Sequence, residues 1–169
     1  MSVEVGTVIP DITLKYCQYD ASLPADACGR PQDFHTHEKL KGKKAVIFAV
    51  PGAFTPTCHN DHLPGYLKKY DQLKSNKVDL VICLAANDAF VMDAWGKAQK
   101  VQDKILMVSD GNLEFTKKLG LTMDARGFAM GERTQRFAMI VDNLKVTWIG
   151  VENGSGVEVS GVDSVLSNL

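Results

Sequence analysis

The stretch AVIFAVPGAFTPTC, residues 45–58, decides how the rest of the chain is interpreted. Its first six residues are apolar and rich in β-branched side chains, which predicts a buried strand. A loop of proline, glycine and threonine ends that strand. From Thr57 to about Lys74 the pattern is helical, and the residues expected on its apolar face are Leu63, Tyr66, Tyr70 and Leu73. Cys58 therefore falls in the first turn of a helix that follows a central strand.

Cys58 at this place is a candidate nucleophile. The free N–H groups and the positive dipole end of a helix N-terminus favour a thiolate over a thiol. The alternative is a small buried core residue, which free cysteine often is. Thr55 lies one turn earlier and its hydroxyl could bond the sulfur, while Pro51 and Pro56 stiffen the loop. Thr55 also stands where a CxxC motif would need its first cysteine, so the pattern favours attack on a small substrate over disulfide exchange within an adjacent pair.

At these residues the chain resembles the peroxiredoxins. Pro51, Thr55 and Cys58 fit the signature Pro-x-x-x-Thr/Ser-x-x-Cys, and residues 51–58 followed by HLPGY at 62–66 resemble the type II, or type five, subfamily. The resemblance runs from about Gly42 to the C-terminus. It continues in NDAFVM at 87–92, Ala94-Trp95, Ser109-Asp110 and RTQRFAM at 133–139, and DACGRP at 26–31 is similar to fungal alkyl hydroperoxide reductase-type members.

This resemblance implies a thiol-dependent peroxidase of a homodimeric family. Such an enzyme reduces hydrogen peroxide and alkyl hydroperoxides through a cysteine sulfenic acid, is recycled by thioredoxin or glutaredoxin, and serves antioxidant defence and redox homeostasis. It implies no metal, haem or flavin. Attack on a peroxide also needs a fixed cation, which an arginine supplies. Arg136 opens an apolar strand and matches the family's active-site arginine, so we favour it over Arg133 and Arg126. Pro51 would shield the pocket.

The thiol that resolves the Cys58 sulfenic acid is left open by the sequence. Cys28 lies in a polar segment and matches the resolving cysteine of the fungal subgroup, where the bond joins two subunits. Cys83 matches the second cysteine of plant type II enzymes but falls in a strand that is expected to be buried. The mammalian-type cysteine near residues 154–160 is absent. We rank Cys28 first, an external thiol second and Cys83 third, and expect Cys17 to be structural.

The composition fits one globular domain over residues 1–169. Of the 169 residues, 45% are hydrophobic and 23% charged, and a net charge of −1 suggests neither nucleic acid nor an anionic membrane as a partner. No apolar run approaches the roughly 20 residues that span a bilayer, and no secretory signal is recognised. Four cysteines favour a reducing, cytoplasmic location. The terminal Ser167-Asn168-Leu169 differs at one position from a peroxisomal signal, so a peroxisomal location stays an alternative.

Histidines near Cys58 do not predict a metal site. His62 lies one turn after Cys58, where it could orient the loop or simply bond the backbone. The pairs His35/His37 and His59/His62 lack a convincing third ligand, so we expect no metal.

The remaining pattern predicts an α/β protein of thioredoxin-like topology. Alternating strands and helices give a mixed, mostly parallel sheet flanked by helices, with an N-terminal extension. The last helix is expected to begin at a capping box of Ser160 and Asp163. The expected strands are 8–17, 45–50, 78–85, 105–108, 136–141 and 145–151, the last two forming an antiparallel hairpin around Asp142-Asn143. The expected helices are 57–74, from 88 (burying Phe90, Val91, Ala94, Trp95 and Ala98), 113–119 and from 160 (burying Val162, Val165 and Leu166), with residues 19–44 irregular apart from one short helix.

Overall fold

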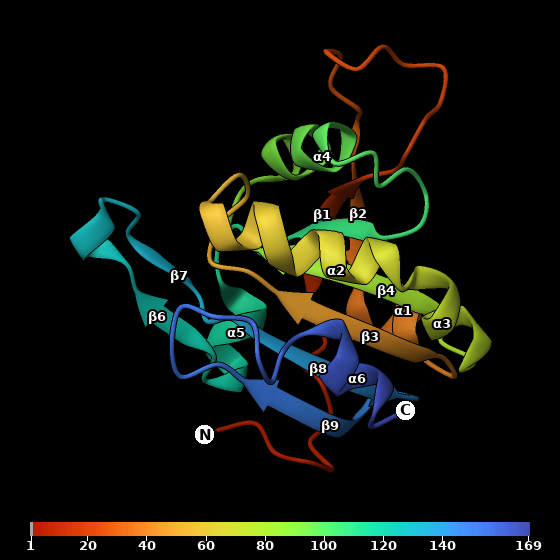
Figure 1. Ribbon diagram of the computed structural model, residues 1–169, viewed down its shortest axis with the longest axis vertical. Coiled ribbons are helices and arrows are strands. Elements are labelled where there is room, and N and C mark those ends of the chain that lie inside the picture. The colour runs from red at the N-terminus through yellow and green to blue at the C-terminus, as the bar shows by residue number, and fades with distance from the viewer. Residues whose placement is uncertain (1) are drawn as a thin grey trace.

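A seven-stranded mixed sheet forms the centre of the computed structural model, which describes residues 2–169 (Figure 1). The strand order is β2-β1-β5-β4-β3-β8-β9. The three central strands β3, β4 and β5 are parallel, and the outer strands join them in antiparallel register. The strands are β1 (Thr13–Cys17), β2 (Pro31–His35), β3 (Lys44–Ala49), β4 (Leu80–Ala85), β5 (Leu106–Ser109), β8 (Phe137–Asp142) and β9 (Lys145–Val151).

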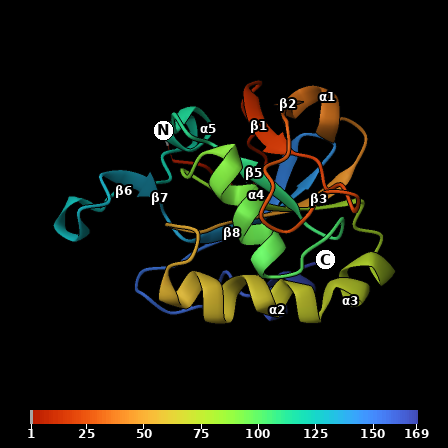
Figure 2. The same cartoon turned by 90° about the horizontal axis from the view of Figure 1, so that it is seen from above.

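Helices cover both faces of this sheet, as a thioredoxin-like fold requires (Figure 2). One face carries α2 (Leu63–Lys68), α3 (Tyr70–Ser75), α4 (Ala89–Ala98) and α6 (Val162–Leu166). The other face carries α1 (Thr36–Leu40) and α5 (Glu114–Leu119), together with the N-terminal segment. Each face has its own apolar core, and Cys58 lies in the core that packs beneath α2 and α4.

A small hairpin projects from the body of the molecule, as Figures 1 and 2 both show. It consists of β6 (Thr122–Asp124) and β7 (Glu132–Thr134), with a 3₁₀ turn at Arg126–Phe128 near its tip. The sequence does not predict this hairpin, because each strand has only three residues and neither alternates clearly in hydrophobicity.

The N-terminal region is more ordered than its sequence suggested. The expected strand 8–17 is shortened to β1, with an isolated bridge between Val8 and Lys145 before it. The segment 19–44, expected to be irregular with one short helix, contains that helix as α1 and also the strand β2. The strand β2 was missed because its polar residues gain their structure from pairing with β1, not from their own pattern.

Two helices differ in detail from expectation. The helix expected over 57–74 is broken into a π-turn (Cys58–His62), α2 and α3, with the interruption at Lys69. In α4 the buried residues are Ala89, Met92, Trp95 and Gly96. Of the expected apolar face, Trp95 is buried and Val91 half-buried, whereas the prediction was wrong for Phe90, Ala94 and Ala98, which are exposed. The buried face of α4 includes Gly96, which has no apolar side chain and so adds nothing to the hydrophobic pattern of the sequence.

The C-terminal elements confirm the expected hairpin but not the expected cap. Strands β8 and β9 pair antiparallel around Asn143 and Leu144, both of which have positive φ. The helix α6 buries Val162 and Val165 as expected, whereas Leu166 is half-buried. Gly161 is its N-cap, and no side chain caps it. The capping box was wrong because the Ser160 hydroxyl bonds Glu152 instead.

Within residues 2–169, none of the helices has the length and apolar character that crossing a bilayer demands.

Candidate active site

Cys58 lies in the helical segment that follows β3, at the edge of the sheet where the parallel strands β3, β4 and β5 end. The helical segment begins at Pro56, so Cys58 occupies its first turn as the sequence indicated. The amide of Leu63 donates to the Cys58 carbonyl, five residues back, which makes this turn a π-turn. Such wide turns occur often at functional sites. The Cys58 side chain is fully buried.

Arg136 places its positively charged guanidinium beside the Cys58 sulfur. It lies immediately before β8, and pairing of Phe137 with Ala49 brings it beside the end of β3. Its Nη2 donates to Cys58 Sγ at 3.3 Å, and only 7% of the residue is exposed. Its Nε has no hydrogen-bond partner among residues 2–169. A buried guanidinium with one unused donor can stabilise a thiolate and also bind an oxygen atom of a substrate.

His62 holds the other side of the Arg136 guanidinium. Arg136 Nη1 lies 3.1 Å from His62 Nδ1, and since the guanidinium can only donate, Nδ1 must accept. This assigns the proton to Nε2, which donates to the Ser160 carbonyl at 3.0 Å. Burial lowers the pKa of His62 to about 4, and the positive charge of Arg136 lowers it as well. His62 is therefore neutral at physiological pH and serves as an acceptor for Arg136.

Glu152 fixes the segment that carries this Ser160 carbonyl. One oxygen of its carboxylate, Oε1, accepts from the Ser160 amide at 2.7 Å, from the Ser160 hydroxyl at 2.8 Å and from the Glu158 amide at 2.7 Å. Burial alone would raise the pKa of Glu152, but these hydrogen bonds outweigh it and hold the pKa below its usual value. Tyr66 also donates to the Ser160 carbonyl, at 2.7 Å. Sequence reasoning missed Glu152, because only tertiary contacts link it to Cys58.

The loop before Cys58 is held by its own hydrogen bonds. The Thr55 hydroxyl donates to the Gly52 carbonyl at 2.7 Å. It therefore does not donate to the Cys58 sulfur, which was the bond that the sequence suggested. Its oxygen still has lone pairs with which it can accept. Arg133 Nη1 donates to the Pro51 carbonyl at 3.2 Å, so Arg133 braces the loop. Arg126 lies on the surface and pairs with Asp124, away from the site.

The other three cysteines lie in contrasting surroundings. Cys28 is exposed. Cys17 is buried, and burial raises its pKa to about 11. Cys83 is fully buried in β4, where burial raises its pKa well above the usual value. Only Cys28 among these three has a thiol open to solvent.

Metal ligands do not cluster in the part of the chain that the structure describes, residues 2–169. His62 is already bonded through both ring nitrogens, and His59 Nδ1 accepts from the Trp95 indole at 3.0 Å. The site is thus built from a sulfur, a guanidinium and hydrogen-bonding groups.

Comparison with known proteins places this geometry in a family. The Redoxin family model matches residues 4–166. The chain belongs to that family and is a peroxiredoxin. Peroxiredoxin-2D of Arabidopsis thaliana is 41% identical over 167 residues, covering 99% of this chain and 98% of its own. Peroxiredoxin-2B of the same plant is also 41% identical, with the same coverage.

A solved peroxiredoxin has the same fold. Prx3 from Vibrio vulnificus, crystallised in its reduced form with hydrogen peroxide, has a TM-score of 0.86 and 45% identity, covering 98% of this chain and 94% of its own. These relatives confirm the thioredoxin-like fold inferred from the sequence. As a peroxiredoxin, the chain is a thiol-dependent peroxidase, an oxidoreductase.

Proposed function

We propose that Cys58 is the peroxidatic nucleophile of this enzyme and that it reduces hydrogen peroxide and small alkyl hydroperoxides. The observation that carries the proposal is the 3.3 Å hydrogen bond from Arg136 Nη2 to Cys58 Sγ, between two buried side chains. A fixed positive charge favours the thiolate, which is the attacking species. The bound hydrogen peroxide of the Vibrio vulnificus protein supports the choice of substrate.

The remaining groups suit an in-line displacement on the O–O bond. The Cys58 thiolate attacks one peroxide oxygen, an S–O bond forms, the O–O bond breaks and the departing oxygen takes a proton to become water or an alcohol. Negative charge spreads over the sulfur and both oxygens, so donors already in place lower the barrier. Arg136 Nε is the donor left free for an oxygen. Thr55 Oγ1 accepts from the peroxide hydroxyl, and Pro51 shields the sulfur from water.

The second half of the proposed cycle is resolution by Cys28. The Cys28 thiol attacks the sulfur of the Cys58 sulfenic acid, an S–S bond forms, the S–O bond breaks and the hydroxyl leaves as water. Cys28 is exposed, whereas Cys83 is enclosed in β4 and stays protonated. An external thiol is the alternative resolving group.

The position of α4 favours a bond between two subunits. Trp95 of α4 and Gln99, its C-cap, both bond His59, next to Cys58. Asp93 and Lys97 bond the main chain on either side of Cys28. The two pairs lie about 200° apart around the helix, so a helix about 10 Å thick separates the two thiols of one chain. Cys28 of the partner subunit in a homodimer avoids that obstacle.

Thioredoxin or glutaredoxin would then reduce the disulfide with two thiols of its own. This fits an enzyme of the cytoplasm, where such thiols are kept reduced.

Two variants test the proposal. Cys58→Ser should abolish peroxide consumption while circular dichroism shows an unchanged fold; retained activity would refute the role of Cys58. One equivalent of hydrogen peroxide should convert the reduced wild type into a covalent dimer on a non-reducing gel, and Cys28→Ser should prevent it. A monomeric band with loss of the Cys58 thiol would instead indicate Cys83 or an external thiol.

A further inference from the structure

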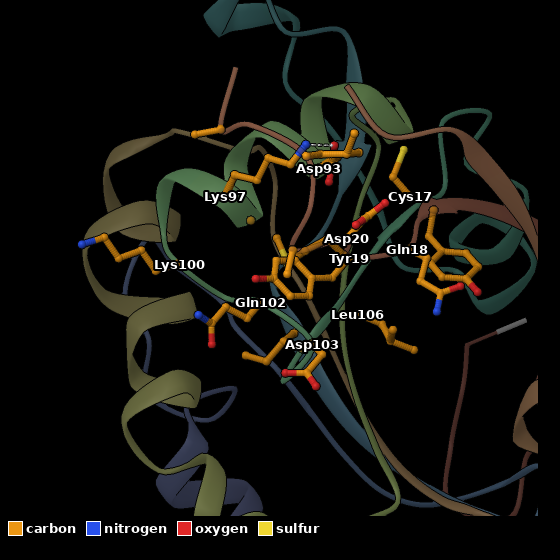
Figure 3. Close-up of a pocket in the computed structure, with 17 residues that line it drawn as sticks. Cys17, Gln18, Tyr19, Asp20, Asp93, Lys97, Lys100, Gln102, Asp103 and Leu106 are labelled. Carbon is orange, nitrogen blue, oxygen red and sulfur yellow. Dashed lines mark hydrogen bonds and ion pairs between the residues drawn. The ribbon is translucent and has the colours of Figure 1, made fainter. Parts of the chain in front are cut away.

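The Cys28 segment is attached to the body of the protein at one short stretch. Among residues 2–169, the hydrogen bonds that join residues 18–30 to other elements occur at Ala27 and Gly29. The earlier part of the segment, residues 18–25, borders a groove of about 400 Å³ that α4 and β5 complete (Figure 3). That part therefore stands off the helix instead of packing closely against it.

Two side chains of α4 form hydrogen bonds with the main chain on both sides of Cys28. Lys97 Nζ donates to the Ala27 carbonyl at 2.5 Å, and Asp93 Oδ2 accepts from the Gly29 amide at 3.0 Å. The two side chains also pair with each other at 2.7 Å across one helical turn. Figure 3 shows them pointing toward one another from α4.

The ion pair is shielded from water, which strengthens the hydrogen bonds that Asp93 and Lys97 form with the Cys28 segment. Only 12% of the Lys97 side chain and 9% of the Asp93 side chain are exposed. Exposed ion pairs contribute little, but a buried pair whose remaining donors and acceptors are satisfied is held firmly. Here Lys97 also donates to the Ala27 carbonyl, and Asp93 also accepts from the Gly29 amide, both in the Cys28 segment. Cys17 adds a third contact, with its Sγ 3.6 Å from the Gly29 carbonyl oxygen.

We propose that the Asp93–Lys97 pair is a positioning device for the Cys28 thiol, which sets the rate at which the Cys58 sulfenic acid becomes a disulfide. The inference rests on the proposed role of Cys28. Holding both flanking peptide groups confines the exposed thiol to a small volume, which raises its effective concentration at the oxidised sulfur. Neither Asp93 nor Lys97 touches the Cys58 pocket, so the peroxide step does not depend on them.

The test separates the two chemical steps by stopped-flow tryptophan fluorescence, to which Trp95, bonded to the neighbour of Cys58, contributes. The rate of the first phase scales with peroxide concentration, and that of the second, the formation of the disulfide, does not. Lys97→Met should slow the second phase about fivefold or more and leave the first phase unchanged. Lys97→Arg should restore most of the rate, because it keeps a cationic donor, and Asp93→Asn should give an intermediate rate.

Two further measurements exclude a merely structural effect. Hydrogen exchange of the Gly29 amide should quicken in Lys97→Met, while the peroxide phase reports an intact Cys58 pocket. Slower resolution should also increase the sulfinic acid formed on Cys58 at a given peroxide concentration, because the sulfenic acid is exposed to peroxide for longer. Lys100→Met is the matched control, because Lys100 borders the same groove but bonds nothing in the Cys28 segment among the residues described.

The outcomes are distinct. A second phase in Lys97→Met that is as fast as in the wild type, or faster, would overturn the positioning role. If Cys28→Ser still prevents the covalent dimer in that case, the role of Cys28 itself stands. A covalent dimer that persists in Cys28→Ser would refute the role of Cys28 itself, and the positioning role with it.

Discussion

Arg136 uses each of its donor atoms differently. Nη2 bonds the Cys58 sulfur, Nη1 bonds His62, and Nε has no partner among residues 2–169. Because the guanidinium is planar, fixing two of its nitrogens fixes the direction of the third. The free donor is thereby held ready beside the sulfur.

We expect Arg136→Ala to slow the peroxide step by about 100-fold, as removal of a donor from a preorganised site typically does. Single-turnover kinetics with hydrogen peroxide measure this rate. Arg126→Ala is the control, since Arg126 pairs only with Asp124 on the surface. An unchanged peroxide rate in Arg136→Ala would transfer the role to Arg133.

His62 should make the stability of the protein depend on pH. Its pKa falls from 6.5 to about 4 on folding, so between these values the unfolded chain binds a proton that the folded protein does not. Stability is therefore complete above pH 6.5 and is lost as the pH falls toward 4, by about 3 kcal/mol in total.

Urea unfolding of the reduced protein between pH 7 and pH 5 measures this loss above the range in which carboxylates titrate. The variant His62→Gln should be less stable at pH 7 but should show a smaller change between the two pH values. An equal change in both proteins would contradict the assignment of His62 as a buried neutral ring.

At the scale of elements, β9 supports the active site through a glycine. A Cβ on Gly150 would lie 2.5 Å from the Val159 carbonyl oxygen and 2.9 Å from the Trp148 ring. The absence of a side chain lets the segment 157–160 lie directly on β9, which in turn places the Ser160 carbonyl against His62. Both strands of the C-terminal hairpin therefore position groups of the site. The strand β8 places Arg136, which precedes it, and β9 supports the segment 157–160 that contacts His62.

Gly150→Ala should destabilise the protein by about 2 kcal/mol, because backbone must move to make room. It should also slow the peroxide step, because Ser160 would shift away from His62. Gly154→Ala is the matched control, since a Cβ there meets nothing within 4 Å. Chemical denaturation and single-turnover kinetics measure the two effects, and equal behaviour of both variants would refute the argument.

At the scale of the whole molecule, the two cysteines of the proposed disulfide start from incompatible positions. Cys58 is fully buried in a core between the sheet and its covering helices, whereas Cys28 is on the surface. Joining them requires the Cys58 turn to open, which gives up its core contacts and its bond to Arg136. The disulfide form is therefore expected to be less tightly packed around residues 57–63.

We expect amide hydrogens of residues 57–63 to exchange faster in the disulfide form than in the reduced form, and the thermal midpoint to fall. Exchange read by mass spectrometry locates the change, and Cys28→Ser, treated with the same peroxide, provides the control without the disulfide. Equal protection of this segment in both forms would mean that Cys58 is resolved without leaving its buried position.

The sequence alone determined the family and the fold class, and it proposed Cys58 and Arg136 as the central residues of the site. The run at 45–58 predicted a buried strand followed by a helix with Cys58 in its first turn, because strong periodicity and loop residues act locally. The choice of Arg136 over its rivals agrees with the geometry, since Arg136 alone of the three bonds the sulfur. The weakly patterned strands β2, β6 and β7 were missed because pairing, not composition, makes them strands.

Only the tertiary structure decided what surrounds those residues. The neutral state of His62, the carboxylate of Glu152 behind Ser160 and the grip of Asp93 and Lys97 on the Cys28 segment all join residues far apart in the chain. The protonation state of a side chain depends on its burial and on the charges around it, and hydrogen-bond partners depend on which segments the sheet brings together. Neither the protonation state nor the set of hydrogen-bond partners can be inferred from the local pattern. A sequence can therefore predict a nucleophile and its cation, whereas only the folded chain determines how they are held.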